Sequence, residues 1–415
     1  MSTDLTSELA VGSSVARAVQ AAQAWVAENF DPSRDTSGSA RRALLERIVD
    51  SGWAAPSWPR SNHGLGLDAE VARATDSVFR TAGVDGYGQD VVNLWAGTII
   101  SAGSDELKAK HIRSMLLGEV NMCLLYSEPG AGSDLASIRT SAVRDGDEWI
   151  INGQKVWTSG GRSADYALLI TRTDLDVPKH RGITFFFLPM KQEGVEVRPL
   201  RQATGDARFN EVFITDARVP HENMLGDYNR GWWVLQTALA YERAVMGQSG
   251  RRRASQSSTE SVRKSDSEAG APVPDVSLLD LAKARGVADD PMLRQRLMRL
   301  REMVAVNEWN GQRAKAAMKA GSSSPLMSLG KLAMSGILHT AGSLQASILG
   351  TEAMLAGDSS PDAADATYSM LNAFFTSIGG GTDQIQRNII GERILGLPKE
   401  PEIDKDVAFR DVRTG

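Results

Sequence analysis

Cysteine is nearly absent from this chain, whose 415 residues include only Cys123. A single thiol cannot form an intramolecular disulfide, which favours a reducing compartment. No stretch approaches the roughly 18 uncharged apolar residues of a membrane span. The first residues carry Asp4 and Glu8, where a signal peptide has basic residues and an apolar run. The sequence therefore predicts a cytoplasmic protein without a membrane span.

A strong excess of charge of either sign is also missing. The chain has 46 Lys and Arg against 51 Asp and Glu, which leaves a net charge of -5. A general nucleic-acid binder normally has a basic footprint, so this mild acidity argues against that class. With 42% hydrophobic and 23% charged residues the composition is that of a folded protein. At roughly 150 residues per domain, the length predicts about three domains.

Residue spacings typical of several catalytic classes are missing as well. No HxxxH, CxxC, G-x-S-x-G or Walker-type lysine pattern occurs, so neither a local metal site nor those hydrolase and nucleotidase classes are predicted. A G-x-G-x-x-A string at 64–69 follows no strand, and it predicts a turn before a helix rather than a dinucleotide site. The histidines lie far apart, at His63, His111, His180, His221 and His339.

The order of apolar patterns along the chain indicates the fold class. Residues 1–120 contain segments with apolar positions at a period near 3.6, which predict helices; these are 15–30, 40–49, 69–81 and 108–117. Residues 121–225 contain short β-branched and aromatic runs, which predict strands; these include 166–173, 182–190, 195–200 and 210–220. The Asn152-Gly153 pair lies between two apolar runs, and such a pair predicts a hairpin turn.

Helical patterns return at 226–400, ahead of a tail at 401–415. Within them, residues 250–275 contain no Leu, Ile, Met or aromatic residue, and this predicts a mobile insertion because such a segment cannot bury a core. The sequence therefore predicts a multidomain α+β protein with a helical domain (1–120), a β domain (121–225) and a second helical domain (226–400).

Two motifs in the predicted β domain suit a flat ligand. The glycine-rich segment from Leu124 to Asp134 lets backbone N–H groups approach a ligand, and Ser127 and Ser133 add hydroxyls. About twenty residues later, Trp157 is followed by two hydroxyl side chains. An aromatic plane beside hydroxyls suits a planar ring with hydrogen-bonding edges, such as a flavin. An ordinary loop and an ordinary core tryptophan are the alternatives.

Together these motifs resemble the acyl-CoA dehydrogenase family. The likeness covers SEPGAGSDLASIRTSAVRDGDEWIINGQKVWTSG, KHRGITFFFLPM and FNEVFITDARVP, and it returns in GGGTDQIQRNIIGERILGLP near the C-terminus. It implies an N-terminal α-helical domain, a middle β-barrel-like domain and a C-terminal four-helix bundle. It also implies FAD bound between the β domain and the bundle, an acyl-CoA substrate, and a homo- or hetero-tetramer.

The resemblance also implies the roles of individual residues. Trp157 would pack on the flavin, Thr158 and Ser159 would hydrogen-bond its edge, and Ser133 would meet the CoA moiety. Thr382 and Gln384 would begin a helix whose N–H groups suit the anionic dinucleotide. The implied FAD-binding residues are Leu124, Tyr126, Ser127, Gly132, Ser133, Trp157, Thr158, Ser159, Thr382 and Gln384.

The catalytic base follows from a second branch of the family. Much of the family has a Glu directly before a Gly-Thr pair near the C-terminus. In this chain the pair is Gly381-Thr382, and the position before it is Gly380. The other branch has the Glu in an L-x-x-E-R pattern on a bundle helix, which is matched by Glu242. On a helix Glu242 shares an apolar face with Leu235, Ala238 and Leu239, and desolvation there would raise its pKa toward that of a general base.

Other residues near this base receive roles from the same resemblance. Tyr241 and Arg243 would contact the substrate. The backbone N–H of Gly380 would bind the thioester oxygen, and its missing side chain would leave room for Glu242. A purely structural Glu242, at a helix boundary or paired with Arg243, is the alternative.

Two FAD-binding elements of the family are missing. The Arg-x-x-F-G segment after the base helix is absent, and Gln-x-x-Gly-Gly is replaced by residues 347–351, Ser-Ile-Leu-Gly-Thr. Steroid side-chain dehydrogenases of this family pair unlike subunits and have fewer FAD sites than chains. Three functions therefore stay open. The first is α,β-dehydrogenation of an acyl-CoA to the 2-enoyl-CoA, with flavin N5 as hydride acceptor and an electron-transfer flavoprotein as electron acceptor. The second is a flavin oxidase or monooxygenase, and the third is a non-catalytic or FAD-sharing partner subunit.

Overall fold

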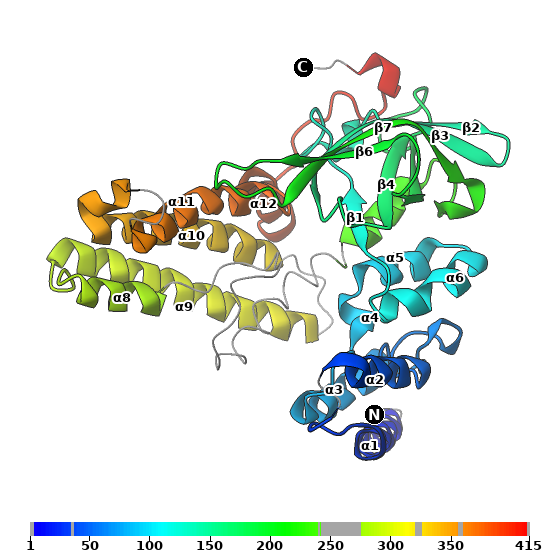
Figure 1. Cartoon of the computed structure of the whole chain (residues 1–415), viewed down its shortest axis with the longest axis horizontal. Coiled ribbons are helices and arrows are strands. Elements are labelled where there is room, and N and C mark those ends of the chain that lie inside the picture. The colour runs from blue at the N-terminus through cyan, green and yellow to red at the C-terminus, as the bar shows by residue number, and fades with distance from the viewer. Residues whose placement is uncertain are drawn as a thin grey trace. The chain divides into compact units, whose positions relative to one another are not determined.

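The computed structural model describes residues 4–34, 37–239, 241, 275–319, 326–355 and 360–412 (Figure 1). Its contacts define two compact units, which are treated separately below. The first contains residues 1–200, 208–249 and 404–415, and the second contains 201–207 and 250–403. The first unit thus holds the predicted N-terminal helical domain and the predicted β domain except for residues 201–207. No helix among the described residues is long and apolar enough to span a membrane.

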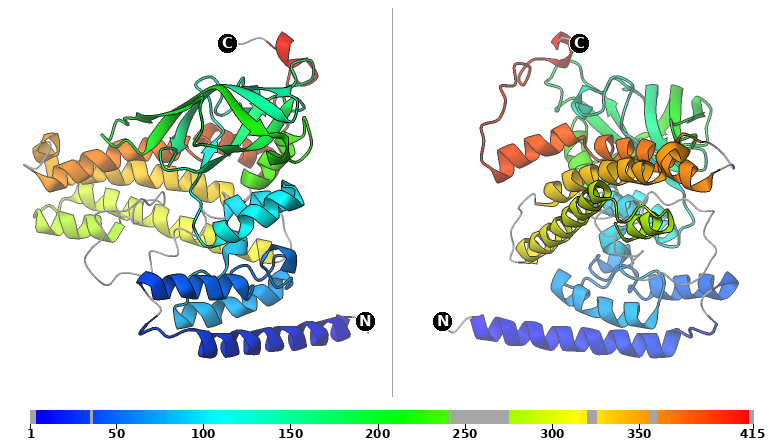
Figure 2. Two further views of the ribbon diagram at one scale, coloured as in Figure 1. Left: turned by 45° about the vertical axis from the view of Figure 1, so that its right-hand side comes forward. Right: turned by 90° about the vertical axis from the view of Figure 1, so that its left-hand side faces the viewer.

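The N-terminal part of the first unit is helical, as predicted. Phe79 is fully buried there and stacks on Tyr87 with ring centroids 4.3 Å apart, while α1 and α3 pack along each other (Figure 2). Ser104 caps α6 by accepting a hydrogen bond from the Leu107 N–H at 3.1 Å. The helices are α1 (Asp4–Asn29), α2 (Gly38–Asp50), α3 (Ala69–Ala82), α4 (Gln89–Val92), α5 (Leu94–Ala102) and α6 (Asp105–Leu116); the sequence had not predicted α4 and α5.

The first unit also contains a mixed sheet. Its strand order is β6-β7-β3-β2-β4-β5-β8, and β1 pairs with β4 in parallel. The strands are β1 (Met122–Leu125), β2 (Ser141–Asp145), β3 (Glu148–Ser159), β4 (Tyr166–Arg172), β5 (Ile183–Pro189), β6 (Val195–Leu200), β7 (Phe209–Pro220) and β8 (Met224–Leu225). The apolar runs at 166–173, 182–190, 195–200 and 210–220 were therefore correctly predicted as strands.

The sheet separates two hydrophobic cores. Phe185 and Phe187 on β5 pack with the buried residues of the N-terminal helices, whereas Phe186, between them, belongs to a core on the other face. All three rings are fully buried. Side chains that alternate between two covered faces explain why this strand reads as a continuous apolar run.

The predicted hairpin turn at Asn152-Gly153 is wrong. The two residues lie inside β3, and the chain reverses instead between β2 and β3, at residues 145–148. The β3–β7 register shifts between Ile151 and Gly153. A Cβ on Gly153 would lie 2.4 Å from Thr140 Oγ1, so glycine is needed there for a close approach of two strands rather than for a turn.

The second unit is helical, in agreement with the predicted fold class. Leu300, Ile337 and Leu344 form its core with their neighbours. Its helices are α8 (Asp275–Ala284), α9 (Pro291–Lys319), α10 (Met327–Leu349), α11 (Pro361–Ile378) and α12 (Asp383–Ile389), and α12 continues into a π-helical turn, η6 (Ile390–Ile394). The predicted mobile insertion at 250–275 lies outside the described residues except for Asp275.

Candidate functional site

The glycine-rich segment leaves the end of β1 and is fastened to β3. The Val156 N–H donates to the Ser127 carbonyl at 2.9 Å, and Glu128 and Ala131 exchange two backbone hydrogen bonds of 2.9 and 3.0 Å around a tight turn. Beyond that turn Gly132 and Ser133 are exposed. The segment thus has a fixed beginning and an open end, which suits a loop that touches a ligand.

A buried ion pair holds this loop from beneath. Lys155 Nζ lies 2.9 Å from Glu128 Oε1 and also donates to the Tyr126 carbonyl at 3.1 Å. The other donors to the Glu128 carboxylate are the N–H groups of Arg139 and Thr140, at 2.7 and 2.9 Å. Both ends of the loop are therefore anchored to a single carboxylate, and the sequence analysis missed this anchor.

Burial acts against the charge of both partners of this pair. Burial lowers the pKa of Lys155 to about 8, although the Glu128 charge works in the other direction. Burial would raise the pKa of Glu128, but the Lys155 charge and the hydrogen bonds outweigh it, and the pKa stays below its usual value. The pair is thus mainly charged at neutral pH. A period of two from Trp149 through Ile151 to position 155 places Lys155 on the buried face of β3, a signal that was readable in the sequence.

Trp157 is exposed because the strand is irregular beneath it. The β3–β7 pairing shifts between Lys155 and Thr158, and Trp157 has a left-handed backbone with φ of 62°. A bulge of this kind redirects a side chain. The indole is 56% exposed and touches Phe209 edge-on at 5.9 Å between centroids. A strained tryptophan presented to solvent is unusual for a core residue and fits a platform for a planar ring.

The hydroxyls after Trp157 are placed differently from each other. Thr158 is 1% exposed, and its Oγ1 donates to the Leu124 carbonyl at 3.3 Å while its own carbonyl accepts from Asn210 at 2.9 Å. Ser159 is partly exposed at the end of β3. Thr158 therefore ties the tryptophan strand to β1, beside the predicted ligand positions Leu124 and Tyr126.

The helix that carries the predicted base is described from Gly231 to Leu239. Leu235 and Ala238, which the sequence places on the same face as Glu242, are fully buried. A Cβ on Gly231 would lie 2.7 Å from the Phe185 nitrogen, so the helix begins in close contact with β5. Glu242 and Arg243 lie outside the described residues.

Tyr241 is described, and it packs with the N-terminal helices. A Cβ on Gly97 of α5 would lie 2.5 Å from its ring. Burial raises the pKa of the Tyr241 phenol. The ring thus helps to hold its helix against the N-terminal helices, in addition to the substrate role that the resemblance implies.

In the second unit, a polar network supports the triple-glycine turn. Gly380 and Gly381 have left-handed backbones with φ of 65° and 87°. Thr382 caps α12 by accepting from the Ile385 N–H at 3.2 Å, and Asp383 accepts from Ser335 at 2.8 Å. Gln384 is exposed. The turn that contains the predicted thioester-binding Gly380 is thus fixed from α10.

The segment that replaces Gln-x-x-Gly-Gly is engaged within the second unit. Arg296 of α9 donates to Ser347 at 2.8 Å and to Ser343 at 3.2 Å. Gly350 ends α10 with a left-handed φ of 58°. The serine that stands in place of the family's glutamine is therefore bound to an arginine of its own chain.

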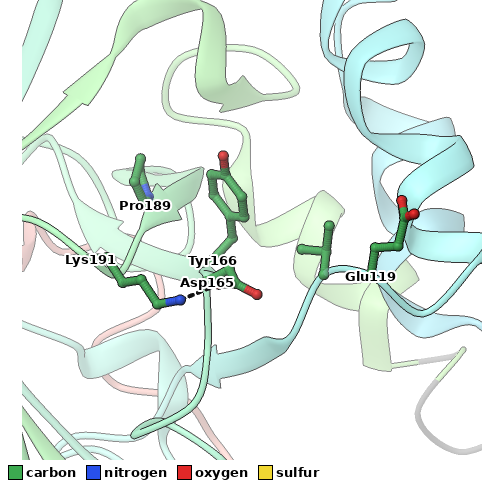
Figure 3. A pocket seen from close by; sticks show the side chains of 6 residues that line it. Glu119, Asp165, Tyr166, Pro189 and Lys191 are labelled. Carbon is green, nitrogen blue, oxygen red and sulfur yellow. Dashed lines mark hydrogen bonds and ion pairs between the residues drawn. The ribbon is translucent and has the colours of Figure 1, made fainter.

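Two cavities of the first unit are lined by other residues. One of about 300 Å³ is lined by Glu119, Tyr166, Lys191 and their neighbours (Figure 3). Because β1 and β4 run parallel, with Met122 opposite Tyr166, this cavity lies at the far end of β1 from Tyr126. Another, of about 430 Å³, is lined by Trp149, His221 and Tyr228 among others. Among the residues that the structure describes, no three His, Cys, Asp or Glu side chains gather as they would around a metal ion.

Comparison with known proteins agrees with this arrangement. Residues 123–217 match the acyl-CoA dehydrogenase middle domain, and residues 277–395 match the acyl-CoA dehydrogenase C-terminal domain. The chain is 32% identical over 401 residues to acyl-CoA dehydrogenase IpdE1 of Mycobacterium tuberculosis, covering 91% of this chain and 96% of that protein. It is 34% identical to acyl-CoA dehydrogenase FadE34 of the same organism, covering 85% of this chain and 46% of that protein.

Solved structures show the same fold. The crystal structure of the ChsE4-ChsE5 complex from Mycobacterium tuberculosis is matched with a TM-score of 0.60 at 28% identity, over 93% of this chain and 98% of that one. The steroid ACAD Tcur3481-Tcur3483 is matched with a TM-score of 0.67 at 24% identity, over 94% and 98%. The chain belongs to the acyl-CoA dehydrogenase family. This confirms the predicted cofactor, because the members of that family are FAD-dependent flavoproteins.

Proposed function

We propose that this chain dehydrogenates an acyl-CoA thioester between the α- and β-carbons, giving the 2-enoyl-CoA. When bound, FAD supplies flavin N5 as the acceptor of the hydride that leaves the β-carbon. The observation that carries this proposal is Trp157, an exposed ring on a strained bulge beside the glycine-rich loop. The C-terminal ends of β1 and β3 lie together, because Thr158 bonds to Leu124 and Val156 bonds to Ser127. The other proposed flavin-binding residues of this unit follow these two strand ends; they are Tyr126, Ser127, Gly132, Thr158 and Ser159.

Residues of this chain remove the α-proton and bind the thioester. Glu242 takes the α-proton. The helical period of the sequence assigns it to the face of Leu235 and Ala238, which are buried, and an apolar surrounding raises the pKa of a carboxyl group toward that of a general base. The backbone N–H of Gly380 donates to the thioester oxygen. Ser133 holds the CoA moiety, Tyr241 and Arg243 contact the acyl portion, and Thr382 and Gln384 serve the dinucleotide.

Glu242→Gln tests the base directly. It keeps the size of the side chain and removes its basicity, so acyl-CoA should still perturb the flavin spectrum while flavin reduction slows by ~10²–10⁴-fold. Reduction at near wild-type rate in a stopped-flow experiment would remove Glu242 from the mechanism.

A second variant refines this experiment. Gly380→Glu in the Glu242→Gln background should recover part of the lost rate if both positions face the same α-carbon. The recovery is limited, because Gly380 has a φ of 65° and a side chain in that region costs about 1–2 kcal/mol.

A FAD-sharing subunit of a heteromeric acyl-CoA dehydrogenase is the second candidate function. It is supported by the missing FAD elements, by Ser347 bound to Arg296, and by two solved relatives that are each named for two different chains, ChsE4-ChsE5 and Tcur3481-Tcur3483. Counting FAD per chain separates the two functions. A chain that purifies colourless and gains flavin only with a second gene product supports the heteromer, whereas stoichiometric FAD in a homo-oligomer supports the first proposal.

The electron acceptor is also part of the proposal. We propose an electron-transfer flavoprotein, which distinguishes a dehydrogenase from a flavin oxidase or monooxygenase on the same scaffold. Mixing the substrate-reduced enzyme with air-saturated buffer decides between them. A dehydrogenase should reoxidise slowly with oxygen and rapidly with an electron-transfer flavoprotein, whereas rapid reoxidation by oxygen alone indicates an oxidase.

A further inference from the structure

The C-terminal segment returns to the sheet-containing unit. Residues 404–412, called the C-terminal strap below, belong to the first unit by their contacts (Figure 1). The Phe409 N–H donates to the Val177 carbonyl at 3.0 Å, and the Arg410 N–H donates to the Leu175 carbonyl at 3.0 Å. Ala408 forms a β-bridge with Pro178. The strap is thus paired with the connection between β4 and β5.

Phe409 links the strap to a buried arginine. The ring is 6% exposed, and the Arg172 guanidinium carbon lies 3.9 Å from its centroid. Burial lowers the pKa of Arg172 to about 10, so the guanidinium is still charged at neutral pH. A desolvated cation over an aromatic face is a favourable contact of about 2 kcal/mol.

Arg172 in turn holds the loop that follows the glycine-rich motif. Its guanidinium donates to the carbonyls of Ala136 and Ile138 and, at 2.7 Å, to the carbonyl of Lys179. Arg172 is itself 3% exposed. Phe409 therefore covers a group that, together with the Glu128 carboxylate, fixes the far end of the loop.

A second connection joins the other end of the strap to the same loop. Lys179 forms ion pairs with Asp404 of the strap at 3.3 Å and with Asp134 of the loop at 2.9 Å. The Lys179 side chain is 15% exposed, whereas those of Asp404 and Asp134 are 31% and 56% exposed, so the lysine end of this bridge is shielded from solvent and the carboxylate ends are partly screened. Asp134 directly follows Ser133. Two routes, through Arg172 and through Lys179, thus run from the strap to residues 134–138.

From these contacts we propose that the C-terminal strap positions the loop at 130–139, and with it Ser133, for the CoA moiety. Phe409 and Asp404 are positioning residues, because neither needs to touch substrate. Gly130 and Gly132 have open space around them and Ser133 is exposed, so this half of the loop has little packing of its own, whereas Ala136 and Ile138 are buried. Fixing the buried half reduces the entropy that the exposed half loses on binding. The proposal rests on the function proposed above for Ser133.

The decisive variant is Phe409→Ala in the full-length holoenzyme. Amide hydrogen exchange at 130–139 should quicken by roughly tenfold, while exchange at 150–159 stays unchanged because Lys155 and Glu128 hold that strand independently. The Kd for free coenzyme A, measured by calorimetry, should rise by a similar factor, with kcat unchanged. Phe409→Tyr should restore both values because it keeps the aromatic face under Arg172.

Two further variants make the result specific. Asp404→Asn leaves Phe409 in place and should give a smaller effect of the same sign. Arg410→Ala removes an ion pair to Asp176 whose side chains are 54% and 66% exposed, and it should change neither readout, since exposed pairs contribute little.

Unchanged exchange at 130–139 in Phe409→Ala would overturn the proposal, and so would faster exchange with an unchanged coenzyme A affinity. The exchange measurement needs no substrate. If the chain fails to dehydrogenate any acyl-CoA, the proposed function falls, yet exchange still reports whether the strap orders the loop.

Discussion

Replacing Lys155 by methionine removes the charged partner that lies within hydrogen-bond distance of the Glu128 carboxylate. The Lys155 side chain is fully buried and that of Glu128 is 8% exposed, so the variant leaves a carboxylate without its countercharge in a protein interior. Breaking a buried pair from one side typically costs about 3–5 kcal/mol. At roughly 2–4 °C per kcal/mol for a unit of this size, the Tm should fall by about 6–20 °C.

A matched control lies on the surface of the same unit. Lys191 forms an ion pair with Asp165 at 2.6 Å, but its side chain is 72% exposed. Lys191→Met should therefore cost less than about 1 kcal/mol, although it deletes the same charge by the same substitution. Thermal unfolding followed by circular dichroism compares the two variants, and adding Glu128→Gln to Lys155→Met should recover part of the loss.

The pH dependence of the same pair has a defined sign. Burial lowers the folded-state pKa of Lys155 from 10.5 to about 8, so between these values the unfolded chain binds more protons than the folded chain. Stability from this residue therefore rises with pH across that window. The Tm gap between wild type and Lys155→Met should widen from about pH 8 to 10.5. A gap no larger than that of Lys191→Met, and flat with pH, would refute the buried charged pair.

Two other predictions concern the strand that carries the platform. Trp157→Ala should raise the Kd for FAD by roughly tenfold, since ring pairs contribute about 0.5–1.5 kcal/mol beyond burial. The Tm of the flavin-free protein should stay within a few degrees because the indole is 56% exposed, and a large fall in that Tm would make Trp157 a core residue. Gly153→Ala should lower stability by about 1–3 kcal/mol, measured by urea unfolding, because its Cβ would lie 2.4 Å from Thr140 Oγ1; an unchanged midpoint would contradict the close approach.

Local sequence patterns were sufficient to predict most helices and strands and to recognise the family. The helices around Phe79 and the strands at 166–172 and 183–189 were readable because apolar periodicity reflects burial on one or both faces. The wrong hairpin turn shows the limit. Asn-Gly favours a turn locally, but β3 uses its glycine to approach Thr140 and its asparagine to bond with Asp216, and both partners are distant in sequence.

The features of the candidate site also fall into two groups, those readable from short motifs and those set by tertiary contacts. The sequence by itself was sufficient to propose the residues around the flavin, the missing FAD elements and Glu242 as the base, because these proposals depend on short motifs. Only the tertiary structure decided that Trp157 faces solvent, that Lys155 and Glu128 anchor the loop from beneath, and that Phe409 returns to cover Arg172. Each of these depends on a register shift or on contacts between residues 27 to 237 positions apart, and no local propensity encodes such contacts.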